Sequence, residues 1–359
     1  MNIFIIILLI FAVIGFIDKA IGGKMELENE IDIGLSTMGT ISIYNVGIYC
    51  LGITFVENNA EVITGFTNSF SMDPSIIIGC ILATDLGAQP IALGVTGDKV
   101  MGYFSGIVVG GCLGQFVSFQ LPVIFSMLDS VTKQKMIRGF IYGIVAIPFG
   151  LIAGGLVMGI PILKLLLNTS IIIVVCIALL IGFLRLPSAT EKILLGISGI
   201  IKVVCQILFI MVIVGIFVPQ INIVSKEVLL NALYLILRMT IIICGGLVLA
   251  KIITEILGNV LEKISRIMET DKLSTIGLLL NAISTLTVVP SLKNMDDNGK
   301  VLNGAFAVSG AYILGGQLAF VLLVAPNYAF AGFVTSKLTA GIMSIIIAVV
   351  VSKHKRERC

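Results

Sequence analysis

The chain has 359 residues, of which 58% are hydrophobic and 12% charged, with a mean hydropathy of +1.13 and a net charge of +3. Soluble domains carry roughly 25% charged residues, so this composition excludes an ordinary soluble protein. Stretches such as 100–128 contain no charged residue and exceed the roughly 20 residues that cross a bilayer. The sequence therefore predicts an all-α polytopic integral membrane protein, whose partner is the lipid bilayer and not nucleic acid.

Hydrophobic segments follow one another along the chain. Eleven can be counted, at about 2–18, 34–56, 74–94, 100–127, 138–160, 164–184, 200–219, 228–254, 273–291, 301–325 and 330–351. The first is expected to be a membrane segment and not a cleaved signal, because no basic leader precedes it. Of two amphipathic stretches between segments, 257–272 is expected to lie at the membrane interface, and 188–199 shows the same pattern more weakly.

Residues that metal sites and hydrolases need are scarce in this sequence. The seven cysteines form no CxxC pair and mostly lie in apolar runs, which is typical of small buried hydrophobic residues. The single histidine, His354, lies in a basic tail, which excludes a histidine-based catalytic triad. The spans also lack clustered histidines or paired acids. We therefore expect neither an enzyme nor a cofactor.

Two parts of the chain repeat one pattern. The stretch 97–101 (GDKVM) precedes 110–115 (GGCLGQ), and 298–302 (NGKVL) precedes 311–317 (AYILGGQ). In each copy the apolar segment before the pattern reaches a proline, Pro90 or Pro290. A duplicated pair of interrupted hydrophobic segments is the best sequence indication of a secondary transporter site. We expect one transport domain over residues 1–359, with repeat 1 at about 1–160, a linking segment at 161–199 and repeat 2 at about 200–352.

The basic residues favour an inverted relation between the two repeats. They cannot all be cytoplasmic if every segment crosses the membrane once. If the segments that reach Pro90 and Pro290 are re-entrant or broken helices, 18 of the 23 basic residues become cytoplasmic. Lys99, Lys164 and Lys226 then lie outside, and Arg238 and Lys337 fall within spans. The sequence thus predicts about 9–11 hydrophobic segments in two inverted repeats, with the N-terminus outside. Unwound crossings, with some basic loops outside, are the alternative.

Asp85 is the leading candidate for substrate binding. A carboxylate this deep in an apolar segment costs on the order of 3 kcal/mol, and Gly87 and Pro90 free backbone carbonyls nearby. A loop-end aspartate that caps a helix is the simpler alternative. The candidate polar partners are Gln89, Gln115 and Gln317, and in the second broken segment Asn281, Ser284 and Thr285. For several of these uncharged residues, hydrogen bonding between packed helices explains the sequence equally well.

Four longer motifs lie in the same regions. They are 82–87 (LATDLG), 97–98 (GD), 147–156 (IPFGLIAGGL) and 295–309 (MDDNGKVLNGAFAVS). They resemble the ethanolamine permease EutH family, and the similarity runs from about residue 34 to 350. The resemblance implies a bacterial cytoplasmic-membrane protein that takes up ethanolamine, beside a cytosolic ethanolamine ammonia-lyase and a metabolic microcompartment.

The chemistry of the candidate residues agrees with that substrate. Ethanolamine, like lysine, is mostly protonated at neutral pH. Asp85 is expected to pair with its ammonium, while Gln89, Asn281, Thr285 or Gln317 orient its hydroxyl. Inverted repeats suit alternating access, because they make two states of one scaffold nearly equal in energy. Facilitated diffusion and symport with a coupling proton both fit, and a homo-oligomer is compatible with the sequence.

Other functions stay open at this point. The protein could carry another small amine, cation or organic solute. A membrane sensor that binds an amine without moving it would be expected to have a signalling domain or a long tail, and the longest tail has about seven residues. A membrane-embedded enzyme would need the clustered histidines or paired acids that the spans lack.

Overall fold

The computed structural model describes residues 3–39, 41–43, 46–47, 50, 72–124, 127–221 and 224–356. Every regular element in these ranges is a helix. Five stretches are long and apolar enough to cross a membrane: Lys99–Leu121, Ser130–Val157, Ile162–Gly182, Lys226–Ile256 and Asn327–Ser352. The predicted all-helical membrane fold is confirmed, whereas about half of the predicted segment 34–56 lies outside the described residues.

The helices are α1 (Ile3–Ala20), α3 (Ser75–Ile81), η1 (Thr84–Leu86), α4 (Ala88–Val95), α5 (Lys99–Tyr103), η2 (Phe104–Gly114), η3 (Phe116–Ile124), α7 (Ser130–Val157), α8 (Ile162–Arg185), α9 (Pro187–Phe217), η4 (Pro219–Ile221), α10 (Lys226–Ile256), α11 (Gly258–Ile267), α12 (Lys272–Ile283), α13 (Thr285–Leu292), α14 (Asp297–Ser309), α15 (Gly316–Val324) and α16 (Asn327–Arg356). Elements η2 and η3 are π-helical, and η1 and η4 are single 3-10 turns. Long π-helices are rare and frequently mark functional sites.

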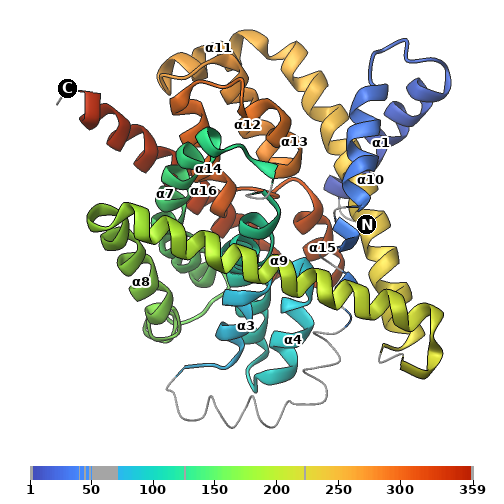
Figure 1. Cartoon of the computed structure of the whole chain (residues 1–359), viewed down its shortest axis with the longest axis vertical. Coiled ribbons are helices and arrows are strands. Elements are labelled where there is room, and N and C mark those ends of the chain that lie inside the picture. The colour runs from blue at the N-terminus through green and yellow to red at the C-terminus, as the bar shows by residue number, and fades with distance from the viewer. Residues whose placement is uncertain are drawn as a thin grey trace.

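Helices α7, α14 and α16 pack closely against one another, on the left of the view in Figure 1. Glycines on α7 allow this approach. A Cβ on Gly143 would lie 2.5 Å from the Ala305 carbonyl oxygen of α14, and a Cβ on Gly150 would lie 2.6 Å from the Ser336 carbonyl oxygen of α16. Any larger residue would push these backbones apart, as at other membrane helix contacts built on small residues.

The predicted segment 74–94 is broken in its middle, where Asp85 lies. Helix α3 ends at Ile81, the next two residues are extended, and the 3-10 turn η1 leads through Gly87 into α4. Gly87 has a φ of +95°, a left-handed conformation that glycine adopts without strain. The predicted broken helix is confirmed, and the break precedes Pro90. That proline lies in the first turn of α4, where a missing N–H loses no helical hydrogen bond.

The predicted segment 273–291 is broken in a similar way. Helix α12 ends at Ile283, Ser284 is extended with φ −161° and ψ 127°, and α13 begins at the next residue. Pro290 lies inside α13, so this break also precedes the proline. In both copies the interruption therefore lies closer to the middle of the segment than its proline suggested.

A third break corrects the prediction of one continuous segment over 301–325. Residues 310–315 separate α14 from α15, and among them Tyr312 has a φ of +63°. The N–H groups of Tyr312 and Leu314 donate to two carbonyls at the C-terminal end of α12, at 3.1 and 2.8 Å. These bonds between segments replace bonds within the helix, which is why an apolar stretch leaves helical geometry here.

Matched contacts occur in the two halves at a fixed spacing. A Cβ on Gly114 would lie 2.0 Å from the Leu82 carbonyl oxygen, beyond the end of α3. A Cβ on Gly315 would lie 1.8 Å from the Ile283 carbonyl oxygen, at the end of α12. Both partners are shifted by 201 residues, from 114 to 315 and from 82 to 283. The same glycine contact thus closes both broken helices, which supports an internal repeat, while its inversion stays a prediction.

Each broken helix is also closed at its base by two aspartates 25 residues apart. In the first hairpin (residues 73–124), the Thr96 hydroxyl donates to Asp73 at 2.6 Å and accepts the Asp98 N–H at 3.0 Å. In the second hairpin (residues 271–324), the N–H of Asp271 donates to the Asp296 carboxylate at 3.0 Å, and the N–H of Asp296 donates to the Asp271 carboxylate at 2.8 Å. Neither aspartate pair was identified from the sequence, because single aspartates at helix starts are common.

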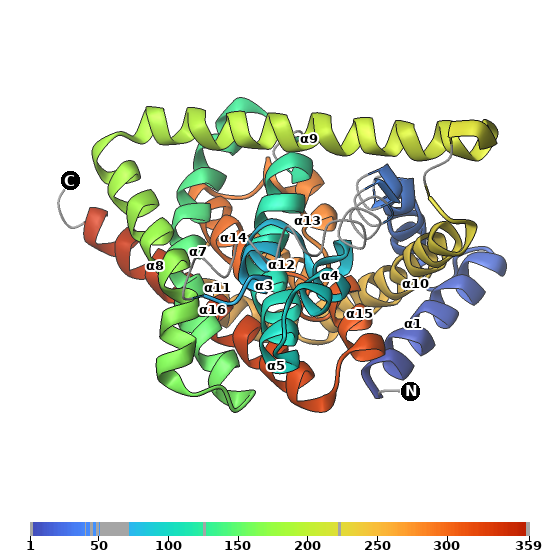
Figure 2. The same cartoon turned by 90° about the horizontal axis from the view of Figure 1, so that it is seen from below.

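The outer helices agree with the predictions in part. Helix α11 is amphipathic as expected, with Leu261 buried and Lys263 exposed. The weaker stretch 188–199 is not a separate interfacial helix, because it continues without a break into 200–217 as α9. Figure 2 shows α9 running along one side of the molecule, across the ends of neighbouring helices.

Ion pairs lie at opposite ends of the bundle. Lys135, near the start of α7, bonds to Asp297 at the start of α14. Lys164 follows the other end of α7 and bonds to Asp98 at 2.5 Å. The 28 residues of α7 separate these two ends by about 42 Å. The end that holds Lys135 is the one predicted to be cytoplasmic.

We expect Lys263→Cys and Lys164→Cys to react with a membrane-impermeant thiol reagent from opposite sides of the membrane. Both side chains are exposed, and the predicted topology places the first inside and the second outside. The variants would be labelled in intact cells and in inverted vesicles, in a background whose native cysteines are replaced by serine. Labelling of both from one side would contradict the topology.

Asp98→Ala is expected to lower the free energy of unfolding by about 1 kcal/mol at pH 7. Asp98 caps α5, because its carboxylate accepts hydrogen bonds from the N–H groups of Val100 and Met101. The Lys164 ammonium, with the cap bonds, holds the Asp98 pKa below its usual range. A carboxylate whose pKa is lower in the folded than in the unfolded protein stabilises the fold at pH values above its unfolded-state pKa. This contribution to the free energy of unfolding disappears as the pH falls through the folded-state pKa.

Unfolding in detergent at several pH values would check this. The difference in unfolding free energy between wild type and Asp98→Ala should become smaller below about pH 4. Lys164→Met, which keeps the cap, should have the smaller effect because the pair is partly exposed. A difference that does not change with pH would contradict the assignment.

Candidate functional site

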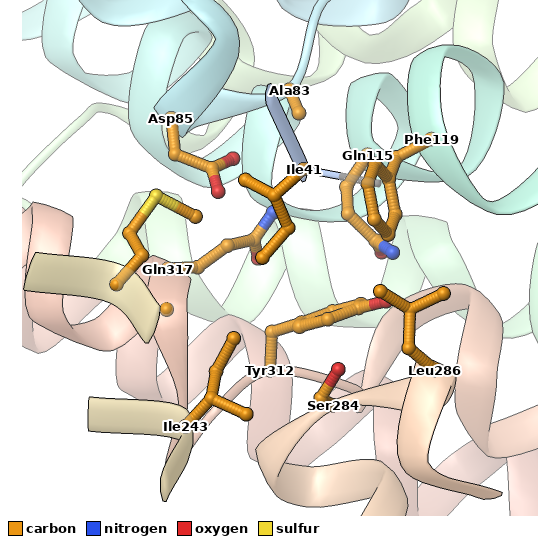
Figure 3. Close-up of a pocket in the computed structure, with 12 residues that line it drawn as sticks. Ile41, Ala83, Asp85, Gln115, Phe119, Ile243, Ser284, Leu286, Tyr312 and Gln317 are labelled. Atoms are coloured by element: carbon orange, nitrogen blue, oxygen red, sulfur yellow. The ribbon is translucent and has the colours of Figure 1, made fainter. Parts of the chain in front are cut away.

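A pocket lies where the three breaks meet in the interior (Figure 3). Its volume, measured as the space open to the centre of a water-sized sphere, is about 20 Å³. Its lining residues come from both halves of the chain: Ile41, Ala83, Asp85, Gln115, Phe119, Met239, Ile243, Ser284, Leu286, Tyr312, Gly316 and Gln317. The repeated segments therefore bring the predicted Asp85, Gln115, Ser284 and Gln317 together, although they are up to about 230 residues apart.

Five polar side chains point into this pocket (Figure 3). Asp85 comes from η1, Gln115 from the junction of η2 and η3, and Ser284 from the second break. Tyr312 comes from the third break, and Gln317 from the first turn of α15. Asp85, Ser284, Tyr312 and Gln317 lie in or beside a break, so broken backbone positions most of the polar set, whereas Gln115 lies in continuous helical backbone.

Most of these polar groups have no hydrogen bond of normal geometry to a described residue, although Gln317 lies beside Asp85 and the Tyr312 hydroxyl lies near Ser284 and Thr285. The carboxamide oxygen and nitrogen of Gln115 and of Gln317, the Ser284 hydroxyl and the Tyr312 hydroxyl are buried without a hydrogen bond to any described residue. A buried polar group that lacks a partner destabilises a fold by about 1–3 kcal/mol. So many unpartnered groups around one pocket are expected where a polar ligand completes the bonding.

The Asp85 carboxylate is the charged group in the pocket lining. It is 8% exposed, and it lies close enough to Gln317 and Lys337 to interact with both. The remaining wall is apolar, with Phe119 packed edge-on against Tyr312 at 5.9 Å between ring centroids. An apolar wall with a few polar groups is typical of small-molecule sites.

Three predicted site residues do not line this pocket. The Thr285 hydroxyl donates to Asn281 at 2.7 Å and accepts from Gln120 at 2.6 Å, while Asn281 donates to the Asn303 carbonyl at 3.0 Å. Asn281 and Thr285 thus hold α12, α13, α14 and η3 together. Gln89 is buried in α4 against the π-helix η2, where a Cβ on Gly106 would lie 2.5 Å from its Cα.

Two notable residues near the site were not selected from the sequence. Tyr312 lies inside a repeated motif, but its role depends on a break that the apolar pattern conceals. Lys337 on α16 is fully buried, and its ammonium donates to the Ala311 carbonyl at 2.7 Å. A lysine in the middle of an apolar segment was the available signal for it. Within the described chain, no three His, Cys, Asp or Glu residues are grouped so that they could hold a metal ion.

Comparison with known proteins gives consistent matches over nearly the whole chain. Residues 1–351 match the family model described as ethanolamine utilisation protein, EutH. The chain is 25% identical to a Listeria monocytogenes protein named probable ethanolamine permease EutH, over 99% of this chain and 95% of that protein. It is 24% identical to an Escherichia coli protein of the same name, over 93% of this chain and 87% of that protein.

A Bacillus subtilis relative, named uncharacterized protein YxeR, is 25% identical over 96% of this chain and 93% of that protein. No solved structure matches the chain. The five apolar helices and the permease relatives identify a multi-pass protein of the bacterial cytoplasmic membrane. The chain belongs to the EutH family of ethanolamine utilisation proteins.

Proposed function

We propose that the protein is a permease that takes up ethanolamine across the cytoplasmic membrane. A transport role is supported by the relatives that are named permeases. One observation carries the substrate assignment: the buried Asp85 carboxylate shares a pocket with amides and hydroxyls that make no hydrogen bond of normal geometry within the described part of the chain. The chemical counterpart of that set is a small cation that also carries a hydroxyl.

Ethanolamine complements these groups. Its ammonium has three donors, which Asp85 and the carboxamide oxygens of Gln115 and Gln317 accept. Its hydroxyl can both donate to and accept from Ser284 or Tyr312. At a ceiling of about 1.5 kcal/mol per heavy atom, four heavy atoms give at most ~6 kcal/mol, or a Kd of roughly tens of micromolar. Affinity of that order suits a carrier that must release its substrate.

Alternating access between two states is the proposed mechanism. The matched closures at Gly114 and Gly315 support two similar hairpins around one site. The breaks beside them would serve as hinges, because a few residues at element ends absorb most of the backbone change in such motions. Inverted repeats would make the outward-open and inward-open states close in energy.

Uptake of labelled ethanolamine into proteoliposomes tests the proposed function. We expect saturable uptake that unlabelled ethanolamine inhibits and ethylene glycol, its uncharged analogue, does not. Binding to the purified protein without uptake would instead favour a sensor. Absence of both would refute ethanolamine as the ligand.

Gln115→Leu and Gln317→Leu are each expected to weaken ethanolamine binding roughly 2- to 12-fold, the effect of one neutral hydrogen bond. Thermal stability should stay constant or rise in Gln115→Leu, because the change removes a buried carboxamide without a hydrogen bond, and it should change little in Gln317→Leu, which also removes a neighbour of Asp85. Gln120→Leu is the matched control, since its side chain donates to Thr285 and to the Ala307 carbonyl. That variant should lose stability, and a loss of stability in all three would mean that Gln115 and Gln317 also join helices.

A further inference from the structure

Lys337 is a buried cation that the proposed binding site does not use directly. Its side chain is 0% exposed, in the middle of the apolar helix α16. Its ammonium donates to the Ala311 carbonyl at 2.7 Å and lies 5.8 Å from the Phe333 ring centroid. Charged residues inside membrane segments are rare and usually functional. One carbonyl bond and one ring are few contacts for a group that carries a full charge.

Asp85 is the negatively charged group that interacts with Lys337. Two titratable groups interact electrostatically with the ammonium: Asp85 on η1 and the Cys112 thiol on η2. On α7, the turn facing this part of α16 includes Gly150, and the nearest titratable residue towards its start, Tyr142, lies eight residues away, about 12 Å.

Helix α14 adds no nearer charge. It meets this part of α16 near Gly310, and its last charged residue, Lys300, lies ten residues earlier, about 15 Å. Among the described elements packed against Lys337, Asp85 is therefore the group of opposite charge that acts on it.

The pocket region thus contains one negative and one positive fixed charge. While empty, the two balance, and an ethanolamine ammonium bound at Asp85 leaves a net charge of about +1. A second ammonium on the ligand would raise this to about +2 in an interior where water cannot screen it. The Lys337 ammonium is bonded to the carbonyl of Ala311, the residue before the pocket-lining Tyr312, and it interacts with Asp85. At an effective dielectric constant of about 20, two like charges repel strongly enough over such a distance to change binding by an order of magnitude or more.

We propose that Lys337 is a specificity-determining residue, a resident ammonium that restricts the site to amines with a single positive charge. This inference rests on the proposed amine site. Lys337 would reject the diamine by charge repulsion, since ethanolamine and ethylenediamine have nearly the same size and shape and the shape of the pocket cannot distinguish them. The same repulsion keeps the affinity for ethanolamine itself moderate.

Ethylenediamine provides the test, because it has the shape of ethanolamine with an amine in place of the hydroxyl. Binding of both ligands to the purified full-length protein would be measured at about pH 6.5, where most ethylenediamine carries two charges. The result is the ratio of the Kd for ethylenediamine to the Kd for ethanolamine, measured for each variant. A change in the protonation of protein groups that both ligands contact affects both Kd values and cancels in this ratio. Wild type is expected to bind the diamine at least about ten-fold more weakly than ethanolamine.

Two uncharged variants should lose this discrimination. In Lys337→Gln, whose amide can still donate to the Ala311 carbonyl, and in Lys337→Met, the ratio should fall by about ten-fold or more, with tighter ethanolamine binding. Lys337→Arg should keep the ratio. Arg238→Gln is the control, because it removes a positive charge from a span where the guanidinium instead lies over the Tyr234 ring, 5.3 Å from its centroid.

The outcomes separate this inference from the proposed function. Wild type that binds the diamine as well as ethanolamine would overturn the role of Lys337, whatever the variants do. A ratio that stays unchanged in folded Lys337→Gln or Lys337→Met would overturn it as well. Wild type that binds no ethanolamine would instead refute the proposed function.

Discussion

Asp85→Asn is expected to weaken ethanolamine binding about 10- to 150-fold while leaving expression and folding intact. The substitution keeps the shape of the side chain but removes the charge that the substrate ammonium would meet. Loss of one charge-assisted hydrogen bond costs about 1.5–3 kcal/mol, and each 1.4 kcal/mol is a factor of about ten. Equilibrium binding to the purified protein and uptake into proteoliposomes would both report it.

Two further variants show whether the effect is specific to the pocket. Asp85→Glu should retain part of the activity, because it keeps the charge and moves it by about one methylene. Asp18 is a matched control, since it is a buried aspartate that accepts the N–H groups of Met25 and Leu27 in a loop. Asp18→Asn should reduce stability without a change in affinity. Unchanged affinity in Asp85→Asn between pH 5 and 8 would make Asp85 structural and the proposed site wrong.

Gly315→Ala and Gly114→Ala are expected to destabilise the fold by about 3 kcal/mol or more each, with loss of transport. A Cβ at either position would lie within about 2 Å of a backbone carbonyl oxygen, at Ile283 or Leu82. Backbone cannot move aside as a flexible side chain can, so the break itself must open. Thermal unfolding in detergent, together with uptake, would measure both effects.

Gly196→Ala is the control for these two variants. Gly196 lies inside α9 with nothing within 4 Å of the position of a Cβ. Alanine there should stabilise the helix by up to about 1 kcal/mol, because it has the higher helix propensity. If Gly114→Ala and Gly315→Ala behave like Gly196→Ala, the two glycine contacts do not close the hairpins.

Much of the fold could be predicted from hydrophobicity and charge. Apolar length identified the five helices that are long enough to cross a membrane, among eleven predicted segments, and the amphipathic pattern identified α11. The repeat was detectable from its lysine and glycine spacing. The prolines, however, indicated the right segments and the wrong positions for the breaks. Each helix ends earlier, because Ala83 and Ser284 adopt extended geometry that no local residue type demands.

The site was harder to predict for a physical reason. Asp85 was identifiable because a carboxylate in an apolar segment is costly wherever the chain takes it. Asn281 and Gln115 are chemically alike, and the difference between them is tertiary: one has partners on a neighbouring helix and the other has none. Tyr312 depends on the third break, which forms because α12 offers carbonyls from a distant part of the chain.

The unequal lengths of the two hairpins have a consequence for the direction of transport. From base to break, the first runs from Asp73 to Leu82 and the second from Asp271 to Ile283, three residues more. At about 1.5 Å per helical residue, the pocket lies about 4.5 Å farther from the base of the second hairpin. With the predicted inversion, the barrier between the pocket and the membrane surface would be thinner on the side of the first base than on the side of the second. Half-saturation concentrations measured from the two sides of the membrane should differ, while the ratio of maximal rate to half-saturation concentration should be equal in both directions if the substrate gradient is the only driving force.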